Sequence, residues 1–155
     1  MTRPARAQAA ARPDPDSADL KCPSAQPDFE DAQVLGVFET AGDTPRLSYT
    51  AGTLPATQDV VASTGPVPPT LVMRFAGKCE TARCVHFREG ACSLVDRIVE
   101  GLDPVTDNLP ACAIRRTCRW YTQEGARACH RCPQVVTRME NPDPQMAAIA
   151  EGPAV

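Results

Sequence analysis

The chain has 155 residues with eight cysteines, sixteen prolines and a formal net charge of −3. No stretch approaches the roughly 18 consecutive apolar residues of a membrane helix, and residues 1–20 lack the apolar stretch of about 7–15 residues found in a secretory signal. These features exclude a membrane span and favour a cytoplasmic protein. Thiols stay reduced in that compartment, so we expect the cysteines to bind metal. A disulfide scaffold is the alternative.

In chain order, the first twenty residues are rich in proline, arginine and aspartate, and they cannot bury enough apolar surface to fold. We expect a disordered arm over residues 1–20 and a disordered tail over residues 139–155. Residues 21–138 then form a single cysteine-rich, metal-binding domain.

The first half of this domain carries strand patterns. Residues 33–39 and 46–50 flank Ala41, Gly42 and Asp43 and predict a hairpin. Residues 56–63 predict a short helix, and residues 71–75 a third strand. The expected N-terminal part is therefore a small β-hairpin or three-stranded unit.

The second half has helical periodicity. Apolar residues at 94, 95, 98, 99 and 102 share one face of a helix that ends near Asp103 and Pro104. A second helix is expected after Thr117, with Gly125 as a terminator. The fold class is therefore α+β, with a helical half that metal organises.

The predicted metal ligands form two groups. The first is Cys79-x4-Cys84-x-His86-x5-Cys92, and the second is Cys112-x5-Cys118-x10-Cys129-x2-Cys132. If one helix spanned residues 118–132, Cys118 and Cys129 would lie about 16 Å apart along its axis and could not share a centre. Either Gly125 breaks this helix, or Cys118 belongs with Cys112 and the first group, and the spacing leaves both pairings open.

The cysteine spacing favours an iron–sulfur cluster over zinc. Zinc sites usually contain two short chelating pairs, whereas this chain has only the Cys129-x2-Cys132 pair, followed by Pro133. Cys22 stands far from its fellows and is not expected to ligate. His86 and His130 are expected to lie outside the metal's ligand set.

No catalytic residue is predicted. The Cys129-His130-Arg131-Cys132 sequence has the form of a redox dithiol but lacks the βαβ context of thioredoxins, so a thiol oxidoreductase is the weakest option. Basic residues cluster near the second group and favour an acidic partner protein over nucleic acid; they are Arg115, Arg116, Arg119, Arg127, Arg131 and Arg138.

Three segments, LPACAIRRTCRWYTQEGARACHRCPQVVT, RFAGKCETARCVHF and KCPSAQPDF, resemble small cysteine-rich bacterial proteins. The resemblance covers about residues 21–138 and implies one domain that includes Cys22, but it implies no activity or cofactor. The cysteine order differs from that of ferredoxins, thioredoxins and the iron–sulfur transcription factors of actinobacteria.

The expected function therefore depends on the thiols. We expect a small metal-binding protein, iron–sulfur in type, that acts in electron transfer or redox sensing as an accessory to a partner. The alternative is a structural zinc module that binds protein or nucleic acid.

Overall fold

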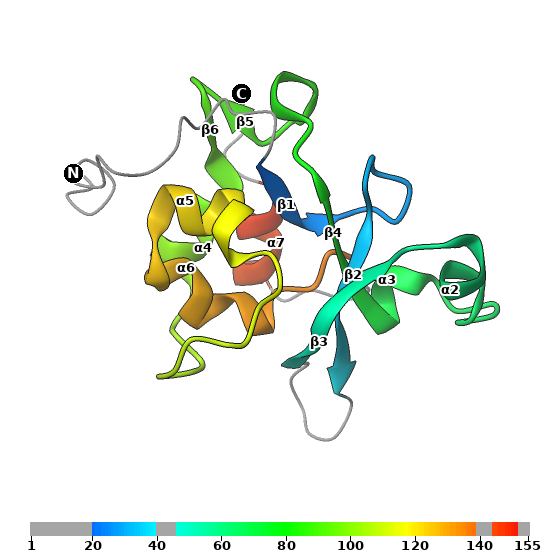
Figure 1. Ribbon diagram of the computed structural model, residues 1–155. Coiled ribbons are helices and arrows are strands. Elements are labelled where there is room, and N and C mark those ends of the chain that lie inside the picture. The colour runs from blue at the N-terminus through cyan, green and yellow to red at the C-terminus, as the bar shows by residue number, and fades with distance from the viewer. Residues whose placement is uncertain (1–19, 40–45, 139–143, 152–155) are drawn as a thin grey trace.

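The computed structural model describes residues 20–39, 46–138 and 144–151 (Figure 1). Most of the predicted arm, residues 1–19, and parts of the predicted tail, residues 139–143 and 152–155, lie outside the described residues. The strands are β1 (Lys21–Ala25), β2 (Gln33–Glu39), β3 (Arg46–Pro55), β4 (Met73–Lys78), β5 (Phe87–Arg88) and β6 (Ala91–Cys92). The α-helices are α2 (Gln58–Ala62), α3 (Pro69–Val72), α4 (Ser93–Gly101), α5 (Arg119–Glu124), α6 (Ala126–Arg131) and α7 (Pro144–Glu151), and three 3-10 turns are η1 (Thr81–Arg83), η2 (Arg115–Thr117) and η3 (Cys132–Gln134).

A four-stranded antiparallel sheet forms the first half, in the order β1-β4-β2-β3. The pairing of β2 with β3 confirms the predicted hairpin, and β4 is the predicted third strand. The fourth strand, β1, was not predicted. It pairs with β4 at the sheet edge, with Cys22 opposite Gly77. Pro23 lacks a backbone donor, so an edge position is the one that this segment can occupy.

Both faces of the sheet are covered. Adjacent residues of β2 point to opposite faces, because side chains alternate along a strand. Leu35 packs with the helical half in one core cluster, whereas Val34 packs with Met73 and Phe75 in another, against Val60 of α2. The alternation explains why one sheet supports the cysteine-rich half on one face only (Figure 1).

The predicted long helix is confirmed as α4, which buries Val95, Ile98 and Val99. The segment from Cys118 to Cys132 is two helices rather than one. Gly125 separates α5 from α6 with φ 72° and ψ −153°, a conformation that is essentially restricted to glycine. The chain therefore turns at Gly125, and α6 packs back against α5.

Residues 144–151 differ from the prediction. They were expected in a disordered tail but form helix α7, which packs on α4. Ile149 is buried, its carbonyl accepts a hydrogen bond from Arg97 Nε at 2.6 Å, and its side chain lies against Gly101. Pro144 occupies the start of this helix, where a missing N–H costs nothing.

Within the described part of the chain, every helix is too short or too polar to cross a bilayer.

Candidate metal centres

All eight cysteines are free thiols, and they fall into two groups of four. We call Cys22, Cys79, Cys84 and Cys92 the first quartet, which lines a cavity of about 380 Å³. We call Cys112, Cys118, Cys129 and Cys132 the second quartet, which lines a much smaller cavity of about 20 Å³. The structure thus groups the cysteines in fours, the number that thiolate-ligated metal centres commonly use.

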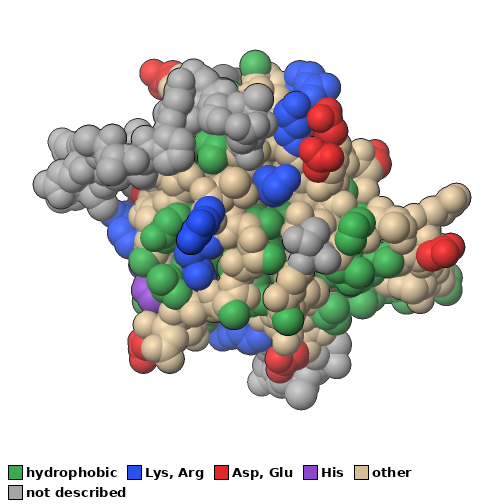
Figure 2. Space-filling model, in the orientation of Figure 1, with side chains coloured by type: hydrophobic (Ala, Val, Ile, Leu, Met, Phe, Trp, Pro, Cys, Tyr) green, Lys and Arg blue, Asp and Glu red, His purple; other side chains and the backbone are tan. Residues whose placement is uncertain are grey.

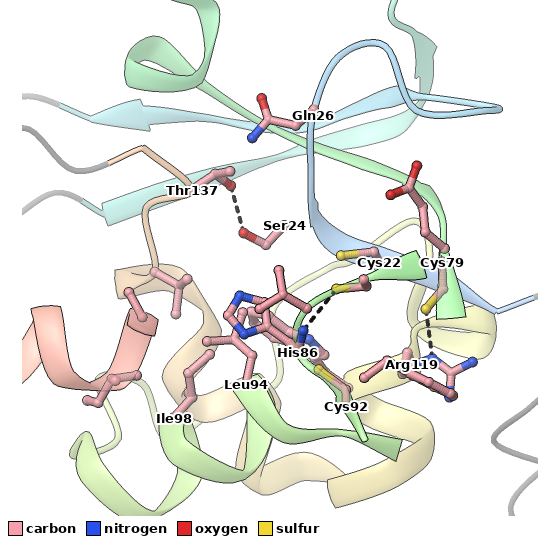
Figure 3. Close-up of a pocket in the computed structure, with 18 of the residues that line it drawn as sticks. Cys22, Ser24, Gln26, Cys79, His86, Cys92, Leu94, Ile98, Arg119 and Thr137 are labelled. Carbon is pink, nitrogen blue, oxygen red and sulfur yellow. Dashed lines mark hydrogen bonds between the residues drawn. The ribbon is translucent and has the colours of Figure 1, made fainter. Parts of the chain in front are cut away.

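The first quartet joins the sheet to α4. Cys22 comes from the edge strand β1, and Cys79 follows the neighbouring strand β4 and donates its N–H to the carbonyl of Leu20 at 3.0 Å. Cys84 follows η1, and Cys92 immediately precedes α4. Figure 3 shows Cys22, Cys79 and Cys92 arranged around one space.

Cys22 is the ligand candidate that the sequence analysis left out. It lines the same cavity as Cys79, Cys84 and Cys92, and negative charge on these sulfurs would raise its pKa, as burial does. Its distance along the chain hid this relation, because strand pairing between β1 and β4 is a long-range contact. The total of eight cysteines, divisible into two sets of four, was the available signal.

The second quartet is assembled by the break at Gly125. Cys118 precedes α5, Cys129 lies in α6 and Cys132 begins η3, while Cys112 comes from the loop before η2. Cys118 lines the second cavity with the other three. Of the two pairings that the spacing left open, the structure has the one in which the helix ends at Gly125.

Burial makes the thiolate form costly at several of these cysteines. It raises the pKa of Cys92 to about 11, although the nearby N–H groups of Leu94 and Val95 lower it. It also raises the pKa of Cys22 and, strongly, that of Cys118. These sulfurs therefore need a bound cation to exist as thiolates near neutral pH.

A hydrogen-bonded amide holds Cys92 in place. Cys92 donates its N–H to Gln123 Oε1 at 2.8 Å, and Gln123 Nε2 donates to the Cys92 carbonyl at 2.7 Å. Gln123 lies in α5 and is buried. The backbone of a first-quartet cysteine is thus fixed by the helix that follows Cys118.

Arg74 is fully buried beside the second quartet. Its guanidinium donates to Cys132 Sγ, to the carbonyls of Cys132 at 2.5 Å and Val135 at 3.0 Å, and through Nε to the carbonyl of Pro23 at 2.8 Å. Burial lowers the pKa of Arg74, but Cys132, Tyr49 and Cys118 together outweigh it and the pKa is raised. A buried cation in this position requires a negative partner.

Arg119 has the same relation to the first quartet. It is 2% exposed, and its Nε donates to Cys79 Sγ at 3.0 Å (Figure 3). Its two Nη atoms are buried and have no hydrogen-bond partner among the described residues. Buried donors are nearly always satisfied, so Arg119 has capacity for further acceptor atoms.

The rings of the two histidines, His86 and His130, form no hydrogen bond to a cysteine sulfur among the described residues. The His86 ring contacts Arg97 Nη2 through Nδ1 at 2.9 Å, and burial together with Arg97 and Arg88 lowers its pKa. Only its backbone N–H reaches a thiol, Cys84 Sγ, at 3.4 Å. Nδ1 of His130 is buried and has no hydrogen-bond partner in the described part of the chain.

The predicted basic face is divided between surface and interior. Arg119 is buried, Arg115 donates to the Pro110 carbonyl, and Arg131 donates to the Leu102 carbonyl at 2.7 Å. Arg116 is exposed. On the face shown in Figure 2, Lys and Arg side chains are dispersed among acidic ones.

Neither quartet is a compact single-ion site. Among the described residues, no three Cys, His, Asp or Glu side chains converge closely enough to hold one metal ion. In the first quartet the sulfurs instead line part of a cavity of about 380 Å³, which has room for a group of several atoms.

No family model, curated protein or solved structure shows a significant match to this chain.

Proposed function

We propose that this protein is a small iron–sulfur protein with two four-cysteine centres, acting in electron transfer or redox sensing as an accessory to a partner protein. One observation carries the proposal: the eight cysteines are grouped in fours, and each group has its own buried arginine. A thiolate-ligated cluster supplies the negative charge that each arginine requires.

Arg119 favours a cluster over a single ion at the first quartet. A zinc ion with four thiolates offers only cysteine sulfurs as acceptors, whereas a cluster adds inorganic sulfides. The Nη donors of Arg119 lack partners among the described residues, and Arg119 lines the cavity of the first quartet. Hydrogen bonds to cluster sulfurs also adjust the reduction potential.

Structural zinc is the second candidate, and the second quartet supports it. Its cavity of about 20 Å³ is small for a cluster, and four thiolates are the ligand set of a structural zinc ion once they close around it. In that case the protein is a zinc-stabilised binding module, and the second quartet stabilises the turn between α5 and α6.

The partner is proposed to be acidic and to bind near the exposed Arg116 and Arg138. A reducing compartment such as the cytoplasm is proposed because free thiols persist there.

The test is metal and sulfide analysis of protein purified without oxygen. Two filled clusters predict about four irons and four sulfides per quartet, with broad visible absorption. Cys84→Ala and Cys129→Ala should each remove about half of the iron, because they belong to different quartets. His86→Gln and His130→Gln are the matched controls and should keep all of it.

A colourless protein with about two zinc ions per chain supports the module instead. A protein that binds neither metal under these conditions overturns both candidates.

A further inference from the structure

We propose that the second quartet, when it holds no metal, exchanges its thiols with small disulfides, with Cys129 as the attacking sulfur and Cys132 as the sulfur that resolves the mixed disulfide. The product is a Cys129–Cys132 disulfide. This inference goes beyond the iron–sulfur function and does not depend on it. It starts from the Cys129-His130-Arg131-Cys132 sequence, which has the form of a redox dithiol.

The backbone brings the two cysteines to the spacing of a disulfide. Cys129 lies in α6, and the helical conformation continues through Arg131 to Cys132, whose φ and ψ are −55° and −40°. Two Cα atoms three residues apart on a helix are separated by about 5 Å, since three residues nearly complete one turn. Disulfides join residues whose Cα atoms lie about 4.4–6.8 Å apart. The pair can therefore close with little movement of the backbone.

The space between the four sulfurs suits a bond between two of them. Their cavity is about 20 Å³, and no three Cys, His, Asp or Glu side chains converge on one ion among the described residues. Cys132 is nevertheless close enough for its charge to act on Cys129. A disulfide needs only this pair, whereas a metal centre needs all four sulfurs to close around it.

An arginine stands beside each of the two sulfurs. Arg74 donates to Cys132 Sγ and, at 2.5 Å, to the Cys132 carbonyl, so it holds both the sulfur and the backbone of this residue. Arg115 lies beside Cys129, where its positive charge offsets part of the cost of burying a thiolate. Positive charge near a cysteine favours the thiolate, which is the form that attacks a disulfide.

Exposure assigns the two roles. Cys129 is half-buried, whereas Cys132 is only 9% exposed. An incoming disulfide therefore reaches Cys129 first, and Cys132 attacks the sulfur of its neighbour from inside the protein. Because even Cys129 is only partly exposed, the substrate is a small disulfide rather than one within a folded protein.

The exchange is balanced as a two-electron step. Cys129 Sγ attacks one sulfur of the small disulfide, whose S–S bond breaks, and the first small thiol leaves with a proton. Cys132 Sγ then attacks Cys129 Sγ, displaces the second small thiol and forms the intramolecular S–S bond. The protein dithiol loses two electrons and two protons, and the small disulfide gains them. A quartet filled with metal has no free thiol for this reaction, so metal binding and exchange exclude each other.

Peptide mapping of the parent chain gives the first test. The full chain is reduced, then incubated under argon with glutathione disulfide and a chelator, and its remaining thiols are alkylated before digestion. Trypsin cuts after Arg127, Arg131 and Arg138, so peptides 128–131 and 132–138 stay joined only by the proposed disulfide. We expect this joined pair as the first protein disulfide to form. No oxidation, stable glutathione on Cys129, or a disulfide from Cys129 or Cys132 to another cysteine overturns the proposal.

Two serine variants test the roles, and each is the matched control for the other. Cys132→Ser lacks the resolving sulfur and should accumulate glutathione on Cys129. Cys129→Ser should leave Cys132 unmodified, because Cys132 is buried in the folded protein. Circular dichroism shows whether both variants keep the fold, and the mapping of the parent chain decides the proposal if one does not. Equal addition of glutathione to the remaining cysteine in two folded variants overturns the assigned roles.

Discussion

Replacing Arg74 with methionine tests whether the positive charge of this buried arginine is balanced by a negatively charged metal centre in the second quartet. Methionine fills similar space but removes the donors to the carbonyls of Pro23, Cys132 and Val135 and to Cys132 Sγ. Each buried acceptor left without a donor costs about 1–3 kcal/mol. The carbonyl cost is present whether or not metal is bound.

The charge effect depends on the metal. In the loaded protein, removing one member of a buried charge pair costs about 3–5 kcal/mol, a large part of a typical stability of about 5–15 kcal/mol. In the metal-free protein the guanidinium lacks the negative charge of a bound centre, so its removal costs less there. We therefore expect Arg74→Met to destabilise the loaded protein more than the metal-free protein.

Denaturant unfolding under argon, followed by circular dichroism with and without metal, gives the two free-energy changes. By linkage, their difference equals the loss in metal-binding free energy, and a difference of about 2.8 kcal/mol corresponds to roughly a hundredfold weaker binding. Arg116→Met is the control, because this exposed arginine should change stability by less than about 0.5 kcal/mol. Equal destabilisation of the two forms by Arg74→Met would refute the charge argument.

Other substitutions probe the supports of each quartet. Gly125→Ala should destabilise the protein by about 1–3 kcal/mol and release metal from the second quartet, because alanine does not tolerate the backbone conformation of Gly125. Gly52→Ala is the control, because Gly52 has open space around it. Equal iron loss from both variants would contradict this prediction. Gln123→Met should lower the free energy of unfolding by about 1–3 kcal/mol and speed the loss of iron from the first quartet to a chelator. An unchanged rate of iron release would show that the Gln123 amide does not hold this quartet in place. Ile149→Ala should cost about 2–5 kcal/mol in thermal unfolding by undocking α7, and a melting curve identical to that of the parent would show that α7 adds no stability.

Short-range sequence patterns predicted the elements whose conformation depends on residues close to them in the chain. The apolar periodicity after Cys92 located α4, and the separation of Cys118 from Cys129 along a continuous helix made a break at Gly125 one of two alternatives. In both cases the constraint lies within about three turns of chain, where spacing and geometry are directly related.

Features that depend on distant partners were not predictable in the same way. The edge strand β1 forms because β4 offers unpaired backbone groups, and this pairing brings Cys22 to Cys79. Arg119 looked like a surface cation in a basic segment, yet its burial is explained by a sulfur forty residues upstream. A charge pattern does not distinguish a cation that faces solvent from one that faces an anionic centre.

The edge position of Cys22 also sets an order for assembly. The second quartet is contained within residues 112–132, so its sulfurs can meet by closing short loops. The first quartet spans residues 22–92 and needs β1 docked on β4 before its fourth sulfur arrives. We expect maturation to proceed from the second centre to the first, so that a chain with only one centre filled contains a completed helical half and an unfinished sheet edge.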